Sequence, residues 1–358
     1  MRFKKSKWQA IFALTFTLSL CITPQTRADT SIFKNSEKVV YFLDVSSSSD
    51  SKRLWTFLRT SLLERLETAL GAPSRPGIKK AIKPTDLSIS VINDNSQSAQ
   101  VIEILSVRDA EQIWGFMINK VGGGKPTSLR MEEIYKDFFG NPGVYSALVR
   151  EFADEEQAQS ISTSSCQRRA ESEFKRGNFM DNVTPAIRTE ASKEVCSVIT
   201  KLIKGINLAD EVFKSDQCGE KACSDVIGAV QRAQAVAVDL TKGRSINGVK
   251  PKLCLAIASD MLNNYPGISK TSPWNTLQAI KASKSTEDAE NLGRAVAEEA
   301  SIKFTSKVKV RVEVIGQGAS KNFPRELRSK LDAYWNGFWS SAGVQGSAQQ
   351  ASLDQACK

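Results

Sequence analysis

The chain has 358 residues, of which 41% are hydrophobic and 25% charged, a composition typical of one large folded domain or two smaller ones. It contains no histidine, which excludes Ser-His-Asp and Cys-His catalysis, HExxH metalloproteases and His-ligated zinc sites. The formal net charge of +10 would suggest a nucleic-acid or membrane-surface partner, but half of this charge lies at the N-terminus.

The N-terminus is typical of a secretory signal peptide. A basic start is followed by an apolar stretch from Trp8 to Ile22, and "TRA" before Asp29 offers the small residues of a cleavage site. Residues 1–28 carry five of the 49 Lys and Arg and none of the 39 acids, which leaves 44 basic against 39 acidic residues, a net charge of +5. Since no dense basic stretch remains to follow a phosphate backbone, we expect no nucleic-acid partner. We expect an exported protein, secreted or in the cell envelope, which meets a membrane only through its transient signal peptide or by association with the surface.

Two other interpretations of the N-terminus are open. An uncleaved segment could anchor the chain in a membrane, although the apolar stretch is shorter than the ~20 residues that a span needs. A lipid could be attached at Cys21, although Leu20 stands where such sites usually have a small residue. Both objections favour cleavage.

Six cysteines follow the signal segment, and an even count in an exported chain suggests disulfides. Cys218 and Cys223 flank the short polar loop "GEKA", which a bridge could close. Cys166 and Cys196 both lie in segments with a helical pattern, which a bridge could join.

The last two cysteines lie far apart in the sequence. Cys254 is part of an apolar strand pattern and is either a buried free thiol or the partner of Cys357. The connectivity of these cysteines is therefore open at this point.

The first third of the chain alternates predicted strands and helices. "KVVYFL" (38–43) is a short apolar run rich in β-formers, as expected for a parallel strand that is buried on both faces. Apolar residues at three- and four-residue spacing predict a helix over 51–70. Strands predicted over 86–94 and 99–107 lie close enough in sequence to pair as a hairpin, and a helix is predicted over 108–120.

Between residues 128 and 216 the pattern changes to consecutive helical segments without strands. This block is too polar to belong to a core throughout, so we interpret it as a helical insertion that could form a subdomain. On this interpretation residues 128–216 are dispensable for the fold of the sheet.

The alternation of helices and strands then resumes. The elements expected here are a helix, a strand, a helix, a strand and a helix, at 224–240, 252–260, 286–303, 307–316 and 323–341. Ser224 is the expected N-cap of the first of these helices. "KVKVRVEVIG" (307–316) alternates charge and valine, which predicts a half-buried strand near a sheet edge. Residues 342–358 are predicted to be a low-complexity C-terminal tail.

Strands that alternate with helices predict an α/β domain over 36–341, with a doubly wound, mostly parallel sheet and helices on both faces. Ligands bind beyond the carboxyl ends of the strands in such sheets. Two strands here end in aspartate, Asp44 and Asp260, and Ser224 begins a helix just before the second of them. If the two strands are neighbours, carboxylates and hydroxyls meet in one crevice. These groups are the ligands of a hard divalent cation, above all Mg²⁺.

The loop after the first strand carries a family resemblance. "DVSSS" matches the D-x-S-x-S signature of the von Willebrand factor A family at Asp44, Ser46 and Ser48. The match falls at the end of the first strand and before a long predicted helix, as in the family. The resemblance covers residues 38–107 and 217–341, with the helical block as an insertion.

Two further segments resemble the family. "CSDVIGAVQRA" resembles the element in which a threonine precedes a helix, with Ser224 in the threonine position, and "LCLAIASDM" is similar to the strand that ends in the second metal-site aspartate, here Asp260. Thr127 in "GGGKPTS" is an alternative to Ser224, which we prefer because its helix leads into the Asp260 strand. The sequence distance from Asp44 to Ser224 is longer than usual in the family, which the insertion would explain.

The resemblance implies a metal-ion-dependent adhesion site. Ser46 and Ser48 would coordinate Mg²⁺ or another divalent cation through their hydroxyls, with Ser224 as the third hydroxyl, and Asp44 and Asp260 would hold it directly or through water. The sixth position would be left for a carboxylate of a partner protein or peptide. The leading hypothesis is thus an exported, non-enzymatic binding module.

The same residues allow other interpretations. The family fold could carry a degenerate, metal-free site, with the helical insertion binding the partner. A metal-dependent hydrolase that uses the same acids is less favoured, because no general base has an obvious neighbour. The serines after Asp44 could simply cap a helix. "GGGKPTS" departs from a phosphate-binding loop, since Pro126 follows the lysine, and Trp335 and Trp339 are expected in the core.

Overall fold

The structure is a computed structural model that describes residues 37–46, 56, 85–121, 148, 163–176, 184–215, 223–243, 250–318, 323–344, 348–352 and 356–357. All of these belong to one structural unit, Phe33–Lys358. The expected signal peptide (1–28) lies outside the described residues, as does the helix expected over 51–70 apart from the helical residue Thr56. Among the helices that the structure describes, none is both long and apolar enough to span a membrane.

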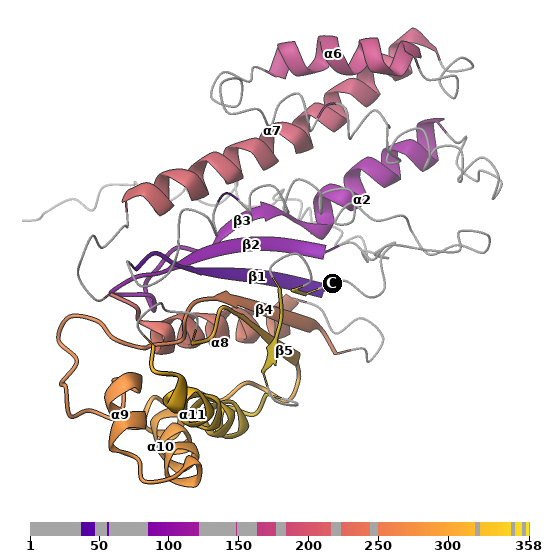
Figure 1. The fold of residues 1–358 in the computed structure, drawn as a ribbon. Helices are drawn as coiled ribbons and strands as arrows, with labels where there is room; N and C mark the ends of the chain where they lie inside the picture. Colours follow the sequence, from indigo (N-terminus) through magenta and orange to yellow (C-terminus); the bar gives the residue numbers. More distant parts are fainter. Residues whose placement is uncertain are drawn as a thin grey trace, which may run out of the picture. The chain divides into compact units, whose positions relative to one another are not determined.

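The centre of the fold is a six-stranded sheet in the order β3-β2-β1-β4-β5-β6 (Figure 1). Neighbouring strands are parallel except for β2 and β3, which form the expected antiparallel hairpin. This arrangement confirms the predicted doubly wound α/β fold. The strands are β1 (Glu37–Asp44), β2 (Thr85–Ile92), β3 (Ile102–Leu105), β4 (Lys252–Ala258), β5 (Lys309–Ile315) and β6 (Gln349–Gln350).

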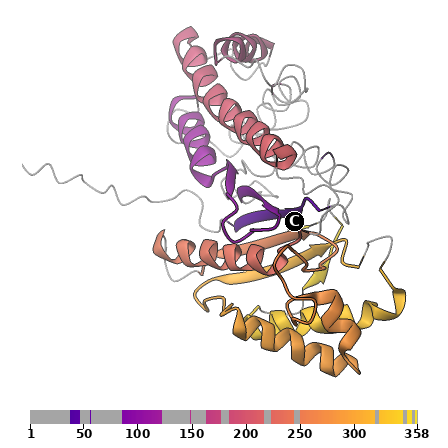
Figure 2. The ribbon, with the colours of Figure 1, turned by 90° about the vertical axis from the view of Figure 1, so that its left-hand side faces the viewer.

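Helices cover both faces of the sheet (Figures 1 and 2). On one side are α2 (Val107–Phe116), the π-helical turn η1 (Met117–Val121), α6 (Thr163–Arg176) and α7 (Pro185–Ser215). On the other side are α8 (Val226–Gly243), α9 (Thr276–Ala282), α10 (Thr286–Glu299), the 3₁₀ turn η3 (Arg325–Leu327) and α11 (Arg328–Ser341). Of these, α9 was not predicted.

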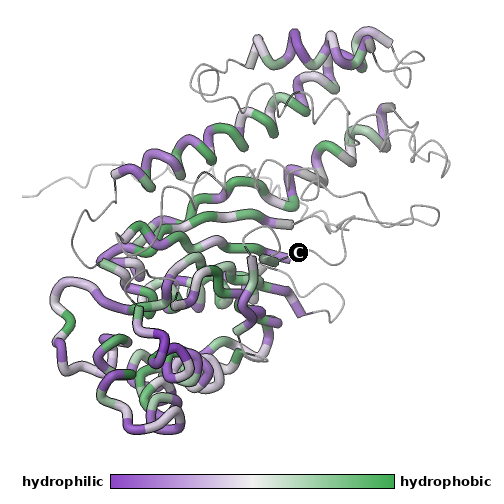
Figure 3. Tube along the Cα trace, in the orientation of Figure 1, coloured by the Kyte–Doolittle hydropathy of each residue, from purple (hydrophilic) through white to green (hydrophobic). Residues whose placement is uncertain are grey.

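Each parallel strand sends alternate side chains into two cores, as the two-residue period of a strand requires. In β1, Tyr41 and Leu43 pack on the side of α7, whereas Val40 and Phe42 pack on the side of α8 to α11. This explains why the strand is a continuous apolar run rather than an alternating one. Figure 3 shows the same contrast: the strands are mainly hydrophobic, whereas α6 is mainly hydrophilic.

Helix α7 is a core element within the block that was interpreted as an insertion. Its buried apolar side chains join the cluster formed by β1, β2 and β3; they include Val195, Val198, Ile199, Leu202, Ile203 and Ile206. Lys201 of α7 also pairs with Asp109 of α2 at 2.8 Å and with Glu103 of β3 at 2.9 Å. Burial alone would lower the pKa of Lys201, but these two carboxylates outweigh it and raise the pKa above its usual value. This packing argues against the expectation that residues 128–216 are dispensable.

The expected pairing of Cys166 with Cys196 is confirmed, and it joins α6 to α7. Cys254 of β4 is not a free thiol but is bonded to Cys357. Cys223 is also in a disulfide. Cys218, its expected partner, lies outside the described residues.

Strand β5 lies next to the edge of the sheet, as predicted, since in the described part of the chain the two-residue strand β6 is the one strand on its outer side. Its valines, Val310, Val312 and Val314, face the side of α8 to α11. The residues predicted to be a low-complexity tail include β6 and Cys357, so part of this segment belongs to the folded sheet.

Helices α10 and α11 approach each other closely at two glycines. A Cβ added at Gly337 of α11 would lie 2.0 Å from the carbonyl oxygen of Glu290, and one at Gly293 of α10 would lie 1.9 Å from that of Tyr334. Both contacts are with backbone atoms, which cannot rotate away. The two glycines therefore set the distance between these helices.

A pair of leucines in α7 tests its place in the core. Leu202 is fully buried and Leu208 is 39% exposed. We expect Leu202→Ala to lower the free energy of unfolding by about 2–5 kcal/mol, because it leaves a cavity, and Leu208→Ala to change it by less than about 0.5 kcal/mol. Urea titration of both variants measures this. Equal small effects would show that α7 is an appended helix.

A pair of glycine-to-alanine variants tests the close contact between α10 and α11. Gly337→Ala should destabilise the protein by at least about 1–3 kcal/mol, since the helices must move apart to admit the methyl group. Gly115→Ala in α2 is the matched control, because nothing lies within 4 Å of its added Cβ and alanine favours a helix over glycine. Thermal unfolding should show a lower midpoint for the first variant only.

Candidate functional site

The strand order reverses direction between β1 and β4, which is where doubly wound sheets bind ligands. Strand β1 ends at Asp44, and β4 ends at Ala258, followed by Ser259 and Asp260. The pairing of Leu43 with Ala258 brings Asp44 alongside Ser259. The two strands predicted to end in aspartate are therefore neighbours, and their carboxyl ends lie together.

Asp44 is buried, with 1% of its surface exposed, and its carboxylate accepts hydrogen bonds from three protein residues. The backbone N–H of Ser46 donates to Oδ1 at 2.9 Å. The hydroxyl of Ser224 lies 3.0 Å from Oδ1 and 3.1 Å from Oδ2, and the hydroxyl of Ser259 donates to Oδ2 at 2.7 Å. These donors satisfy hydrogen-bond acceptors of the buried carboxylate.

The loop before α8 is held at this edge by backbone hydrogen bonds. Ser224 and Asn264 exchange N–H···O bonds of 2.8 Å in both directions, and the N–H of Asp225 donates to the carbonyl of Asn93 at 2.8 Å. The loop thus bridges the ends of β2 and β4. This position brings the hydroxyl of Ser224 to Asp44 from 180 residues away in the sequence.

Ser224 was predicted to be the N-cap of α8, and this is wrong. The carboxylate of Asp225 accepts the N–H of Gly228 at 2.8 Å through Oδ1 and that of Ser96 at 3.2 Å through Oδ2. Asp225 is therefore the cap, and the hydroxyl of Ser224 is available for Asp44. The added Cβ of any residue at position 228 would lie 1.9 Å from the Asp225 carboxylate, so the cap requires Gly228.

The segment after β4 makes a tight turn at Asp260. Its Oδ1 accepts the N–H of Leu262 at 3.1 Å, and its carbonyl accepts that of Gly318 at 3.0 Å. Met261 takes a left-handed conformation with φ of 63°, and its carbonyl accepts the indole N–H of Trp335 at 2.9 Å. Bonds from α11 and from the loop after β5 therefore fix the backbone that presents Asp260.

A second acidic group lies beside the site. Burial raises the pKa of Asp225; the hydrogen bonds from Gly228 and Ser96 oppose this, and the charge of Asp94 adds to it. The pKa of Tyr265 is also raised, by its own burial and then by the negative charge of Asp225. Asp94, Asp225 and Tyr265 thus interact electrostatically where the β2–β3 loop, the loop before α8 and the segment after β4 meet.

The structure brings together most of the residues that the sequence nominated. Asp44, Ser46 and Ser224 are linked by hydrogen bonds, and Asp260 adjoins Ser259, which contacts Asp44. Ser48 and the alternative ligand Thr127 lie outside the described residues.

Two residues of the site were missed by sequence analysis. Ser259 could have been found from the strand register, since it immediately follows the residue paired with Leu43. Asp225 had a signal of its own, as an aspartate directly before an apolar helix.

No family model matches the chain, and no curated protein matches it. Among solved structures, the chain is similar to the human COPII-coat protein Sec24c, with a TM-score of 0.31 and 10% sequence identity. The alignment covers 89% of this chain but only 30% of that one. A likeness this weak carries no argument about function, so the function has to be argued from the site itself.

The oxygen donors at Asp44 fit a hard divalent cation. A serine hydroxyl that donates a hydrogen bond to a carboxylate still has lone pairs with which its oxygen can bind a cation. The hydroxyl of Ser224 donates to Asp44 in this way. Hydroxyl and carboxylate oxygens, without nitrogen or sulfur, are the donor set that Mg²⁺ and Ca²⁺ prefer.

A second cluster of ligand-type residues does not fit a metal ion. Cys254, Glu313 and Cys357 have their ligand atoms within 4.8 Å of one another, and no other group of three His, Cys, Asp or Glu this close occurs among the described residues. The two sulfur atoms are joined in a disulfide, however, and thiolates are what bind metals. The cluster is therefore structural in this oxidation state.

The hydrogen bonds of Ser259 generate a prediction. Its hydroxyl donates to Asp44 and accepts the N–H of Met261 at 2.9 Å. Ser259→Ala leaves one buried acceptor and one buried donor with fewer partners, and should destabilise the protein by about 1–3 kcal/mol. Ser98→Ala, at an exposed hydroxyl, is the control. Chemical denaturation of both variants measures the difference, and equal stabilities would mean that water replaces the Ser259 hydroxyl without loss.

Proposed function

We propose that this protein is an exported, non-enzymatic binding module of the von Willebrand factor A type. On this proposal it uses a divalent cation, Mg²⁺ above all, to engage a carboxylate of a partner protein or peptide. The observation that carries the proposal is the hydroxyl of Ser224 at 3.0 Å from the carboxylate of Asp44, at the point where the strand order reverses. It supports the spatial relation that the resemblance requires between two motifs 180 residues apart.

Each residue has a defined task in this proposal. Ser46 and Ser224 would offer hydroxyl oxygens, with Ser48 as the expected third, and Asp44 and Asp260 would supply negative charge. The cation would provide the positive charge that a partner carboxylate needs in order to bind at this edge. Asp44 is already fixed in orientation by its three donors, so little ordering would be required when the cation binds.

The disulfides support export. Cys166–Cys196 and Cys254–Cys357 are both formed, and disulfides persist in oxidising compartments such as the extracellular space or the periplasm. This agrees with the signal peptide expected over residues 1–28.

A second candidate function has its own supporting observation. The Asp44 carboxylate receives hydrogen bonds from three protein residues, so the site can be satisfied without a cation. In that case the fold would be a metal-free interaction protein, and the helical block that contains α6 and α7 would bind the partner.

Thermal unfolding with and without magnesium separates the two candidates. If the cation binds the native state, saturating Mg²⁺ should stabilise the wild type by mass action, by about 2.7 kcal/mol at a hundredfold excess over the dissociation constant. Asp44→Ala should lose this shift, because Mg²⁺ gives up its waters only to strong anionic ligands. Asp239→Ala is the control, since that carboxylate lies on the solvent side of α8 with 71% of its side chain accessible.

Two other results of the unfolding experiment would contradict the cation proposal. No shift in the wild type would favour the metal-free candidate. Equal shifts in the wild type and in Asp44→Ala would place the cation elsewhere. Because Asp44→Ala also removes the acceptor of two buried hydroxyls, Asp260→Asn serves as a second variant that keeps the shape of the side chain; it should lose the shift as well.

A further inference from the structure

The segment after β4 contains a buried asparagine that has no task in the proposed function. Asn263 lies three residues after Asp260, and none of its surface is exposed. Its Oδ1 accepts the N–H of Ile227 at 3.0 Å, and its Nδ2 donates to the carbonyl of Trp274 at 2.8 Å. Because one partner is a donor and the other an acceptor, a single orientation of the amide satisfies both. The side chain is therefore fixed in place.

The bond to Ile227 connects Asn263 to the start of α8. The first N–H groups of a helix have no partner within the helix, so they need an acceptor from elsewhere. The N–H of Ile227 is such a group, and Asn263 caps it from a different part of the chain. The segment that carries Asp260 thus supplies part of the cap of the helix that follows Ser224.

The backbone of Asn263 is also held in place. Its N–H donates to Oγ1 of Thr276 at 3.3 Å, and its carbonyl accepts the N–H of Thr276 at 3.2 Å. Together with the bond to Trp274, these contacts close residues 264–275 at the base of their loop, where α9 begins. A shift of Asn263 would therefore break contacts with the starts of both α8 and α9.

The candidate ligands in the described part of the chain lie on three pieces: the end of β1, the loop before α8 and the segment after β4. The ladder between β1 and β4 fixes the first piece relative to the third. The second is tied to the third by the backbone bonds that Ser224 exchanges with Asn264, and by the bond between Asn263 and Ile227. Without the side chain of Asn263, the separation of the Ser224 hydroxyl and the Asp260 carboxylate is less closely fixed.

Mg²⁺ and Ca²⁺ differ in how rigid a site they need. Mg²⁺ requires a nearly octahedral set of oxygens at about 2.0–2.1 Å, whereas Ca²⁺ accepts about six to eight oxygens at about 2.3–2.6 Å in variable arrangements. A site whose ligands cannot move apart therefore favours the smaller ion, and a looser site loses this preference.

We propose that Asn263 is a positioning residue that makes the cation site select Mg²⁺ over Ca²⁺. This inference rests on the proposed function, because it concerns the same site. Asn263 acts through the ligands and not on the ion, since its amide is directed at Ile227 and Trp274. It holds the two pieces of chain that present Ser224 and Asp260.

A purely structural role for Asn263 leads to a different expectation. If the residue only stabilised the fold, its loss would weaken the binding of both ions by the same factor or leave both unchanged. The ratio of the two dissociation constants therefore separates positioning from stability.

Calorimetric titration of Mg²⁺ and of Ca²⁺ into the folded protein tests the proposal. Asn263→Leu keeps the branched shape of the side chain and removes its hydrogen bonds. It should raise the dissociation constant of Mg²⁺ at least about tenfold more than that of Ca²⁺. Leu202→Ala is the control, because it destabilises the core beneath α7 and should leave the ratio unchanged. If Asn263→Leu does not fold, Asn263→Ser, which leaves room for a water, replaces it with the same expected change.

The possible results distinguish this inference from the proposed function. An unchanged ratio in the folded Asn263 variant, or an equal change in Leu202→Ala, would overturn the inference and leave the proposed function in place. A wild type that binds neither ion would overturn both. Binding that persists in Asp44→Ala would place the ion elsewhere and would also overturn both.

Discussion

The burial of one carboxylate, that of Asp44, constrains the whole carboxyl edge of the sheet. A charge at 1% exposure needs hydrogen-bond donors, and here they come from three separate segments of the chain. Ser259 can reach it only if β1 and β4 are neighbours in the observed register. Ser224 can reach it only if the loop before α8 lies across the strand ends, where Asn93 and Asn264 hold it. The strand order, the start of α8 and the turn after β4 are thus all required for the hydrogen bonds that this carboxylate accepts.

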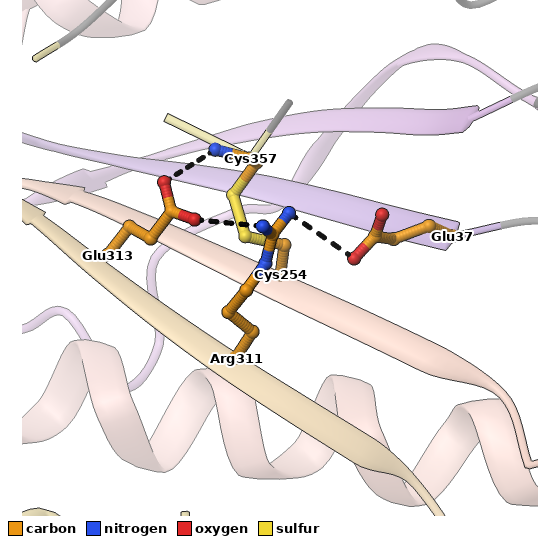
Figure 4. The surroundings of a disulfide bond; sticks show 5 residues. All are labelled: Glu37, Cys254, Arg311, Glu313 and Cys357. Carbon is orange, nitrogen blue, oxygen red and sulfur yellow. Dashed lines mark hydrogen bonds and ion pairs between the residues drawn. A yellow bond between two sulfur atoms is a disulfide. The ribbon is translucent and has the colours of Figure 1, made fainter. Parts of the chain in front are cut away.

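The two faces of β4 carry side chains of different size, and the structural layers that cover them differ accordingly. One face carries branched apolar side chains that fill the space beneath helices, and the other carries Cys254, Ala256 and Ala258. Ala356 and Cys357 pack in the same cluster as these small residues, and the Cα atoms of Cys254 and Cys357 lie 5.8 Å apart. The disulfide (Figure 4) thus links the C-terminal residues to the central strand at a place where small side chains bury little apolar area.

Much of the fold could be predicted from the sequence because local pattern and tertiary environment agree in the strands. The run at 38–43 is apolar throughout because both faces of β1 are covered, and the valine–charge alternation of β5 follows from one apolar core and one charged face. The place of α7 in the core was not expected, because a helix that buries one stripe is polar on average. The apolar stripe of α7 lies at Val195, Ile199, Leu202 and Ile206, and it is diluted by the lysines and acids between them.

The candidate site could be predicted only in part, for a different reason. Asp44, Ser46, Ser224 and Asp260 were nominated by motif, but the N-cap of α8 was assigned to the wrong residue. Serine and aspartate are both good caps, so the order Ser224-Asp225 leaves the choice to tertiary contacts. The sequence offered Cys357 as a partner for Cys254 but could not decide between a bridge and a free thiol, because a disulfide over 103 residues is a long-range constraint that no local pattern encodes.

The surroundings of Asp44 are compatible with both functional candidates, the cation-dependent binding module and the metal-free interaction protein. A buried carboxylate is costly unless hydrogen bonds satisfy it. Ser46, Ser224 and Ser259 all donate to Asp44, so its burial does not by itself require an ion. A cation that binds here would act chiefly on the charge of Asp260 and on a partner carboxylate. The two candidates therefore differ in whether an ion bridges Asp260 to a partner carboxylate, and not in how the protein holds Asp44.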